Sequence, residues 1–559
     1  MKKLLSLFSL TFLAYANEVN NIVKIEETSI KEYDKKSAIT LQWLETKPYS
    51  TIKDFYILQY LKQDITPDEA LEALSMVKSV SNTIFFQFAK KFKHDETIAV
   101  VQCMKASAKD LIDTDANCIK NGLRLKQATK LSQIELLTII KKVEEKYPNF
   151  AQQLKIIAAP IPFTKLISSN IDDFYEVFLN TGINFKIEHF NYKLPLKTIN
   201  KIKDDKRVEK LIKYCITNPK LNLLNKSFLN FEDTTLSSKS SFFLALNSII
   251  YNDFNQAFIY LNNSLNKTTS IIEKNKINFW LYLLTKDENY LETLSTNTNV
   301  DIYSLYVKEL KNIPIKNIKY NISLKQNETK ESFDTKDPFS WFNLLEDTKE
   351  FNEEKFKKYE NLFNKKETLP FLAFIYNKYD NYKTHYFLTP FEEELKDYDI
   401  DRKALVYAIS RQESRFIPTA LSSVYAQGVM QIMPFLSEHI AENLKDEYDF
   451  NKMFEAKTNL KYANYHLNNL QKNLDNPLFI AYSYNAGYGY FKSLKNLGLF
   501  SKNNQFEPFL SMELISYDET KEYGKKVLAN YYIYKNYLDN KKEHKLSFIF
   551  HTLIQPLAN

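Results

Sequence analysis

Apolar residues recur three and four positions apart along most of the chain, which is the spacing of one face of an α-helix. In the stretch FFLALNSIIYNDFNQAFIYLNNSL the pattern includes Phe243, Leu246, Ile250, Phe254 and Leu261. Such segments follow one another and are separated by short clusters of Asn, Asp, Thr and Pro. Because stacked helix pairs bury one another's apolar faces, we expect a long α-superhelix, without a regular repeat of about 34 residues.

The distribution of glycine supports a helical fold. Seven glycines occur in 559 residues, and five of them follow residue 400. Most of the chain therefore lacks the residue that the tight turns of β-hairpins favour. The sequence predicts an all-α protein.

Changes in composition divide the chain into segments, because a chain of this length exceeds what one hydrophobic core supports. The polar stretch from Ser323 to Phe339 marks one boundary. We expect a signal peptide at residues 1–16, an α-superhelical domain at 17–335, a small helical linker domain at 336–390, a C-terminal α-helical domain at 391–540 and a tail at 541–559.

The first residues are typical of a secretory signal. Lys2 and Lys3 precede an apolar run from Leu4 to Leu13, and Ala14-Tyr15-Ala16 has the small-x-small form of a cleavage site. The run is shorter than the roughly 20 residues that span a bilayer, which disfavours a retained membrane anchor. We expect cleavage after Ala16 and an exported protein in the periplasm.

Charge and cysteine content narrow the classes of partner. The formal charge of +7 becomes 7 − 2 = +5 once Lys2 and Lys3 are removed, and no Arg-rich patch of the kind that nucleic acids need is present. Cys103 and Cys118 are the nearest pair of the three cysteines, and a disulfide or buried thiols both fit. The seven histidines are scattered without a metal-binding spacing, so we expect no metal and no cofactor.

An acidic residue stands on the apolar side of a predicted helix near residue 400. With Asp401 as the expected N-cap and the helix propagating from Arg402, the positions of Leu405, Ile409 and Glu413 share one face. Burial and the negative end of the helix dipole both disfavour the charged carboxylate, so the pKa of Glu413 should rise. A carboxyl group of this kind can act as a general acid.

A structural explanation for Glu413 is equally available from helix placement alone. Arg402, Arg411 and Arg415 lie close to it in the sequence, and a buried ion pair would account for the acid without any chemistry.

Polar and flexible residues follow the acid in three further motifs. The segment QGVMQIMP brings Gly428, Gln431 and Met433, whose amide and adaptable apolar surface would suit an N-acetylated sugar. AYSYNAGYGY adds two candidate site residues, the hydroxyl of Tyr484 and the amide of Asn485. ELISYDETKEYG adds a third, the acid Glu519, and Tyr523 follows it by one helical turn.

Glu413-Ser414, GVMQIMP, YNAG and YDETKEY, in this order, resemble the catalytic domain of soluble lytic murein transglycosylases, whose fold is similar to that of goose-type lysozyme. The order of the segments also resembles this family, which has a signal peptide, a superhelix, a linker domain and a lysozyme-like catalytic domain. Only the last roughly 150 residues carry specific motifs; the remainder matches in architecture and around NFWLYLL at Trp280.

The resemblance implies a role for each site residue. Glu413 matches the single catalytic acid and base, and Glu519 matches an acid that supports the active site. The substrate-contacting positions would be those of Ser422, Gln431, Met433, Tyr484 and Asn485. Four positions depart from the usual family residues: Tyr425 stands where glycine is common, Val429 where leucine is usual, Ser483 in place of alanine and Ser516 in place of proline.

The implied reaction cleaves the β-1,4 bond between N-acetylmuramic acid and N-acetylglucosamine without water and leaves 1,6-anhydro ends. Two alternatives stay open: a hydrolytic muramidase of the same fold, and a non-catalytic scaffold that binds the cell wall. We expect a monomer that binds peptidoglycan glycan strands, with cell-wall protein partners on the superhelix and no nucleic acid.

Overall fold

The computed structural model describes residues 39–325, 331–502 and 504–554. The expected signal peptide lies outside the described residues. Nearly all regular structure in the described ranges is helical, which confirms the all-α prediction. No helix in these ranges is both long and apolar enough to cross a bilayer.

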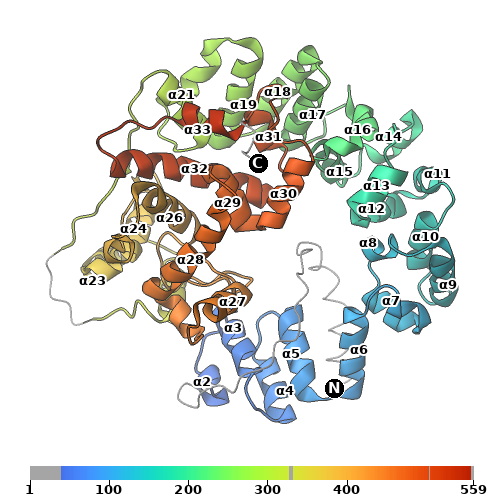
Figure 1. The fold of residues 1–559 in the computed structure, drawn as a ribbon, viewed down its shortest axis with the longest axis horizontal. Coiled ribbons are helices and arrows are strands. Elements are labelled where there is room, and N and C mark those ends of the chain that lie inside the picture. Colours follow the sequence, from blue (N-terminus) through green and yellow to red (C-terminus); the bar gives the residue numbers. More distant parts are fainter. Residues whose placement is uncertain (1–38, 326–330, 503, 555–559) are drawn as a thin grey trace.

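Helices α2 to α21 follow one another around most of a ring (Figure 1). The apolar faces from α7 to α21 belong to one continuous core, and those of α2 to α5 form a second cluster with Phe339, Tyr425, Phe450 and Phe454. The helices are α2 (Leu41–Glu45), α3 (Thr51–Tyr60), α4 (Pro67–Ser75), α5 (Asn82–Phe92), α6 (Asp95–Lys105), α7 (Ala116–Gly122), α8 (Leu125–Ala128), α9 (Gln133–Val143), α10 (Pro148–Ile157), α11 (Pro162–Ser168), α12 (Ile171–Asn180), α13 (Ile183–His189), α14 (Leu196–Ile202), α15 (Val208–Ile216), α16 (Asn222–Asn225), α17 (Ser238–Ile250), α18 (Phe254–Lys267), α19 (Ile271–Thr285), α20 (Glu292–Thr296) and α21 (Ile302–Leu310).

Side-chain caps explain where many of these helices begin. At α4 the hydroxyl of Thr66 accepts a hydrogen bond from the amide of Glu69, whose carboxylate accepts one from the amide of Thr66. Ser132 and Glu135 form the same reciprocal pair at α9. Each pair satisfies two backbone N–H groups that the first helical turn leaves unbonded.

A disulfide joins Cys103 at the end of α6 to Cys118 in α7, with the two Cα atoms 5.1 Å apart. It settles the question that the sequence left open for this pair. Cys215 is buried and unpaired among the described cysteines.

A second group of helices follows the superhelix: α22 (Pro338–Asp347), α23 (Glu353–Leu362) and α24 (Leu369–Tyr379), with their own core of Leu344, Phe363 and Phe371. Two short parallel strands, β1 (Ile318–Lys319) and β2 (His385–Tyr386), pair the segment after α21 with the segment after α24.

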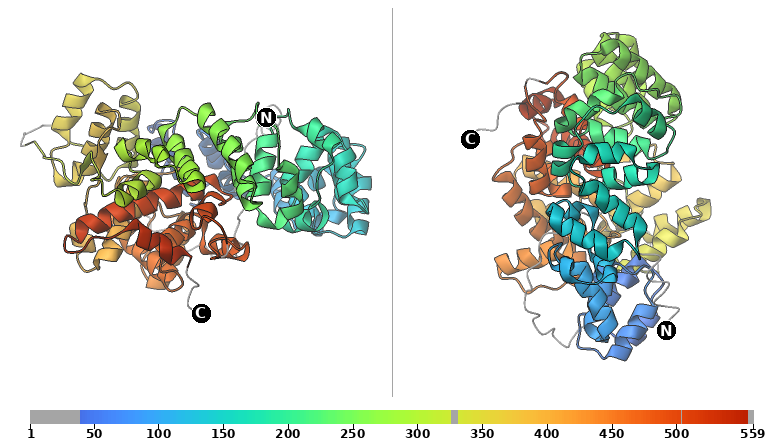
Figure 2. Two further views of the ribbon diagram at one scale, coloured as in Figure 1. Left: turned by 90° about the horizontal axis from the view of Figure 1, so that it is seen from above. Right: turned by 90° about the vertical axis from the view of Figure 1, so that its right-hand side faces the viewer.

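The C-terminal helices pack against one side of the superhelix (Figure 2). They are α25 (Glu392–Leu395), α26 (Ile400–Glu413), α27 (Pro434–Leu444), α28 (Ala456–Gln471), α29 (Pro477–Ala486), α30 (Tyr488–Asn496), α31 (Phe509–Glu513), α32 (Asp518–Leu538) and α33 (Leu546–Leu553). The helix α33 packs back on the superhelix, where Phe550 contacts Tyr306 at 5.0 Å between ring centroids. The part of the tail that the structure describes is thus attached to α21.

The predicted start of α26 was wrong by two residues. The helix begins at Ile400, and its N-cap is Asp399, whose carboxylate accepts a hydrogen bond of 2.7 Å from the amide of Arg402. Asp401 lies inside the first turn, where its carboxylate pairs with Lys535 at 2.6 Å. Both aspartates are good caps, and the ion pair with α32 accounts for Asp401 on the helix itself.

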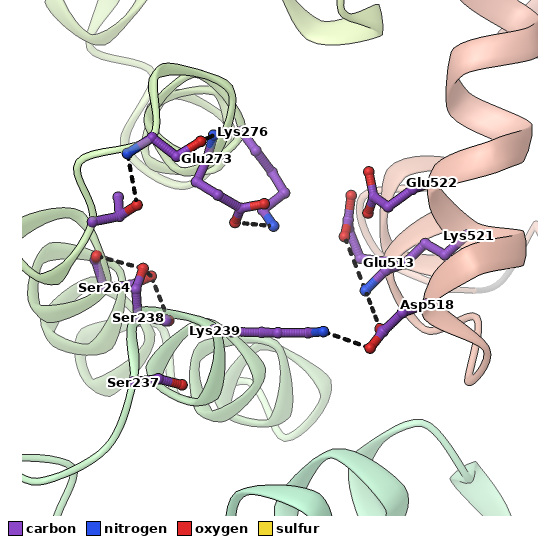
Figure 3. A network of polar contacts seen from close by, with 12 residues as sticks. Ser237, Ser238, Lys239, Ser264, Glu273, Lys276, Glu513, Asp518, Lys521 and Glu522 are labelled. Carbon is purple, nitrogen blue, oxygen red and sulfur yellow. Dashed lines mark hydrogen bonds and ion pairs between the residues drawn. The ribbon is translucent and has the colours of Figure 1, made fainter. Parts of the chain in front are cut away.

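A buried cluster of charges joins α31 and α32 to the superhelix (Figure 3). The carboxylate of Glu513 is fully buried and lies 2.7 Å from Nζ of Lys525, and Tyr303 of α21 donates a hydrogen bond to it. Asp518 pairs with Lys213 and Lys239 of the superhelix at 2.7 and 2.5 Å. Burial by itself raises the pKa of Glu513, but the surrounding lysines outweigh burial and hold the pKa well below its usual range.

We predict that Glu513→Gln lowers the thermal stability of the protein strongly, because it removes the fully buried counter-charge of Lys525, which then keeps only the partly exposed Glu522 at 2.9 Å. Breaking one side of a buried pair costs about 3–5 kcal/mol. The matched control is Glu144→Gln, which removes an exposed pair with Lys155 at 3.1 Å and should cost at most about 1 kcal/mol. Thermal unfolding followed by circular dichroism at pH 7 measures both; equal midpoints for the two variants would contradict the prediction.

Candidate active site

Glu413 is the last residue of α26, and its side chain is partly buried. Ile409 and Leu405, one and two turns earlier, are buried in the core. The helix therefore places the carboxyl group at the edge of the core, where part of the side chain is accessible to solvent, on the face that the sequence pattern predicts.

The hydroxyl of Tyr523 donates a hydrogen bond of 2.6 Å to Oε1 of Glu413. Tyr523 lies in the second turn of α32 and is 5% exposed. Sequence reasoning noted this tyrosine without giving it a role. Its position four residues after Glu519, on the same face of α32, is the signal that would have found it.

The arginines that could have neutralised Glu413 are bonded elsewhere. Arg411 donates to the carbonyl of Tyr386 and to Asn530, and Arg402 donates to Asn464 and Asn468. Within the described ranges no ion pair involves Glu413. A buried ion pair is therefore not the reason for this acid.

Burial raises the pKa of Glu413 to about 7. The hydrogen bond from Tyr523 lowers the pKa and the charge of Glu519 raises it, and both effects are smaller than that of burial. At neutral pH the carboxyl group is thus present in both its protonated and its ionised form, which suits a group that must donate and accept a proton.

Residues 420–432, here called the wall loop, are held beside Glu413 by hydrogen bonds. The hydroxyl of Ser414 donates to the carbonyl of Val429 at 2.7 Å, and the hydroxyl of Tyr484 donates to the carbonyl of Met430 at 2.8 Å. Within the loop, Gln427 and Ile432 exchange two backbone hydrogen bonds of 3.0 Å. The loop is therefore a short, irregular hairpin attached to both α26 and α29.

Gly428 is required where the wall loop passes α28. Its φ is +79°, and a Cβ atom there would lie 2.3 Å from Nδ2 of Asn459 and 2.4 Å from the carbonyl oxygen of Met453. The side chain of Asn459 is fully buried and bonds the carbonyl of Gln427 and the amide of Met430. A larger residue at 428 would displace this asparagine.

The backbone around the acid is strained. Arg415, Phe416, Tyr425 and Gln431 all have positive φ, between +47° and +71°. Non-glycine residues in this region cost free energy and persist only where the surrounding structure holds them. Strain of this kind concentrates at functional sites.

Three of the predicted contact residues belong to the wall loop or follow it. The hydroxyl of Ser422 accepts hydrogen bonds from the amides of Val424 and Ala426 and so shapes the turn. The side-chain amide of Gln431 donates hydrogen bonds from Nε2 to the carbonyls of Ala420 and Gly428. Met433 is the N-cap residue of α27, and its side chain is partly exposed.

The other three predicted residues lie on α29 and α32. Tyr484 is attached to the wall loop as described above, and Oδ1 of Asn485 accepts a hydrogen bond of 2.7 Å from the hydroxyl of Thr520. Gly524 lets the two helices approach closely, since a Cβ there would lie 2.1 Å from the ring of Tyr482. Glu519 is exposed in the first turn of α32 and acts on Glu413 through its charge.

Tyr425 turns away from Glu413. Its ring is 9% exposed and packs in the cluster of Phe55, Phe450 and Phe454, with 5.7 Å between its centroid and that of Phe55. The sequence left open whether this residue narrows the site, and the structure shows that it does not.

No group of three or more His, Cys, Asp or Glu side chains that could hold a metal ion occurs in the part of the chain that the structure describes.

Residues 389–505 match the family model described as "Transglycosylase SLT domain". Curated relatives include a putative soluble lytic murein transglycosylase of Haemophilus influenzae, 34% identical over 146 residues, and the soluble lytic murein transglycosylase of Salmonella typhimurium, 30% identical over 138 residues. These matches cover 26% and 24% of this chain and 24% and 21% of the relatives, so less than a quarter of each relative is aligned. The resemblance found from the motifs is confirmed for this part of the chain.

Two solved structures align over most of the chain at low similarity. They are an inactive mutant of the lytic transglycosylase Slt from Pseudomonas aeruginosa, with a TM-score of 0.44, 13% identity and 90% and 89% of the two chains covered, and the 70 kDa soluble lytic transglycosylase of Escherichia coli, with a TM-score of 0.42, 14% identity and 89% and 88% covered. Both TM-scores lie below 0.5, and we infer nothing from them.

We predict opposite shifts of the pKa of Glu413 in two variants. Tyr523→Phe removes a hydrogen bond that favours the carboxylate, so the pKa should rise above about 7, and Glu519→Gln removes a repulsive charge, so it should fall. Tyr484→Phe is the matched control, because its hydroxyl bonds Met430 and not Glu413. Carbodiimide labelling of Glu413 across pH, read by peptide mass spectrometry, measures all three; shifts of the same sign in the first two would refute this account.

Proposed function

We propose that this chain is a lytic transglycosylase that cleaves the β-1,4 bond between N-acetylmuramic acid and N-acetylglucosamine in peptidoglycan and forms 1,6-anhydro-muramoyl ends. The observation that carries the proposal is Glu413, an acid with a pKa of about 7 that lies inside the segment matching the transglycosylase domain and accepts a hydrogen bond from Tyr523, which follows that segment. The names of the relatives describe enzymes that act on murein.

Glu413 performs both proton transfers. In its protonated form it donates to the oxygen of the breaking glycosidic bond, and the muramoyl ring becomes an oxocarbenium-like species. The resulting carboxylate then takes the proton of the sugar's own 6-hydroxyl while that oxygen bonds to the anomeric carbon. The acid is regenerated, and no water enters the product.

A pKa near neutrality serves both halves of this cycle. An acid with the ordinary pKa of 4.5 would be almost fully ionised at pH 7 and could not donate. The hydrogen bond from Tyr523 stabilises the carboxylate after the first transfer, and Glu519 favours its reprotonation through repulsion.

The remaining predicted residues have positions that fit substrate contact. Ser422, Gln431 and Met433 lie on or beside the wall loop, while Tyr484 and Asn485 lie at the end of α29. We propose that these side chains surround an N-acetylated sugar next to Glu413. Glu519 then acts on the acid by charge and not as a covalent nucleophile.

An exported enzyme is consistent with this substrate. The disulfide between Cys103 and Cys118 is typical of proteins outside the cytosol, and the first residues are typical of a signal peptide. We propose that the mature chain works in the periplasm on glycan strands. A monomeric state and cell-wall protein partners on the superhelix remain predictions.

We predict that Glu413→Gln lowers the release of muropeptides from purified peptidoglycan by about 100- to 10,000-fold with the fold retained, because general acid catalysis contributes this much. The matched control is Glu442→Gln, an exposed residue of α27, which should leave turnover unchanged. Mass spectrometry of the wild-type products distinguishes the alternatives. Anhydro ends support the proposal, ends heavier by one water indicate a hydrolytic muramidase, and absence of cleavage with retained binding indicates a scaffold.

The pH dependence of kcat/KM should follow the protonation of Glu413. Because the first step needs the protonated acid, kcat/KM should fall as pH rises through about 7 in the wild type. In Tyr523→Phe the fall should occur at higher pH and in Glu519→Gln at lower pH. Initial rates on purified peptidoglycan at fixed ionic strength measure the three pH profiles. If the fall in kcat/KM at high pH stays at the same pH in both variants, it must be assigned to a group other than Glu413.

A further inference from the structure

The wall loop is attached on its outer side to helix α3, more than 350 residues earlier in the chain. All but one of the ten residues of α3 are buried, so this helix is enclosed by its neighbours on every side. Phe55 is fully buried, and its ring centroid lies 5.7 Å from that of Tyr425, 5.7 Å from that of Phe450 and 6.2 Å from that of Phe454. The α3 helix thus places one aromatic side chain between three rings of the C-terminal helices.

The contact reaches the backbone of the wall loop by two routes. Tyr425 belongs to the loop and has a φ of +71°, so its backbone depends on what holds its side chain. Gln427, two residues later and fully buried, donates from Nε2 to the carbonyl of Phe450 at 2.9 Å. Phe55 therefore contacts both Tyr425, whose backbone is strained, and Phe450, whose carbonyl holds Gln427.

Polar contacts at the same boundary fix the register of α3. The hydroxyl of Tyr56 donates to Oδ1 of Asn451 at 3.2 Å, and its ring stacks on Phe339 with centroids 5.6 Å apart. Lys62 pairs with Glu438 of α27 at 3.7 Å. These contacts follow α3 on the same side as Phe55, which makes the boundary a specific interface.

The same loop carries Ser422 and Gln431, which we proposed above as contacts to the substrate. The hydroxyl of Ser422 accepts a hydrogen bond from the amide of Ala426, the residue after Tyr425. Gln431 comes four residues after Gln427, directly before Ile432, with which Gln427 exchanges backbone hydrogen bonds. A shift of Tyr425 would therefore move the turn that Ser422 shapes. Displacements of this size next to a reacting bond are costly to catalysis.

We propose that α3 positions the wall loop through the contact between Phe55 and Tyr425, and that Tyr425 is a positioning residue of the active site. Tyr425 replaces a residue that is usually glycine in the resembled family, and a glycine would adopt the positive φ without help. In this chain the aromatic side chain of Tyr425 supplies the restraint. The contact between α3 and the wall loop is thus what keeps the loop in place beside Glu413. The kinetic part of this inference rests on the proposed function.

The experiment uses the full chain with four variants. Phe55→Ala removes the contact from the α3 side, Tyr425→Gly removes it from the loop side and relieves the backbone, and Tyr425→Phe keeps the ring. Phe88→Ala is the matched control, because Phe88 is buried in the same cluster and stacks on Phe92, away from the wall loop. If Phe55→Ala fails to fold, Tyr425→Gly tests the same contact with α3 intact.

Two measurements are made on each variant. Amide hydrogen exchange of peptides covering residues 420–432 reports on the loop, since the amides of Ala426, Gln427, Gly428 and Ile432 are all hydrogen-bonded within it. Steady-state kinetics on purified peptidoglycan give kcat and KM across pH.

We expect Phe55→Ala and Tyr425→Gly to speed exchange of these amides about tenfold or more and to lower kcat/KM about tenfold or more, with the pH at which activity falls unchanged. Tyr425→Phe and Phe88→Ala should behave as the wild type in both measurements. Unchanged exchange in the wall loop of Phe55→Ala and Tyr425→Gly, or an equal effect in Phe88→Ala, would overturn the proposal. Exchange decides this without activity, so a wild-type protein that leaves peptidoglycan uncut would refute the proposed function alone.

Discussion

The hydrogen bond between Tyr523 and Glu413 is the interaction on which the rest of the site depends, because it joins α26 and α32 at the point where an acid is buried. An ionised carboxylate at this position without a partner would be costly, and a carboxyl group paired to a cation would have a lowered pKa and would hold no proton to donate at neutral pH. A tyrosine hydroxyl lies between these limits, since it bonds the acid without adding charge. The arginines on α26 are directed elsewhere, so the pKa of Glu413 is set by burial and modified by Tyr523 and Glu519.

The same compromise between strain and support appears in the backbone. Each non-glycine residue with positive φ costs roughly 1–2 kcal/mol of free energy. Four such residues, at positions 415, 416, 425 and 431, lie within eighteen residues after Glu413. Burial of a large side chain returns about 1.5–3 kcal/mol, which is of the size needed to offset one such residue. Tyr425 and Phe416 are both buried, so their rings hold the conformations that their backbones disfavour. Arg415 has no such burial, and its guanidinium instead lies over the ring of Tyr382 at 5.2 Å.

Local pattern was enough to predict the helices, the near absence of strands among the described residues and the place of Glu413 on its helix, since all three depend on spacings of three or four residues and on glycine usage. It was not enough to choose between two good caps: Asp399 and Asp401 differ only in the tertiary pair that Lys535 makes. The orientation of Tyr425 was beyond reach for a related reason. Its partner Phe55 is about 370 positions away in the sequence, and the residues next to Tyr425 do not show whether its side chain points toward Glu413 or away from it. Tyr523 lay within reach, because its place one turn after Glu519 puts both on the side of α32 that faces the acid.

Two boundaries of different chemistry attach the superhelix to the helices that carry Glu413. At one, Glu513 and Asp518 pair with lysines in a buried polar cluster at the start of α32, which is also the helix of Tyr523. At the other, Phe55 packs among aromatic rings beside the wall loop. Each buried charge in the polar cluster needs its counter-charge, and the aromatic rings at the other boundary hold the wall loop by close packing. The first boundary therefore supports the helix that carries Tyr523, and the second supports the wall loop beside Glu413. The superhelix thus contacts both the helix that carries Tyr523 and the wall loop, which gives it a part in shaping the site as well as in surrounding it.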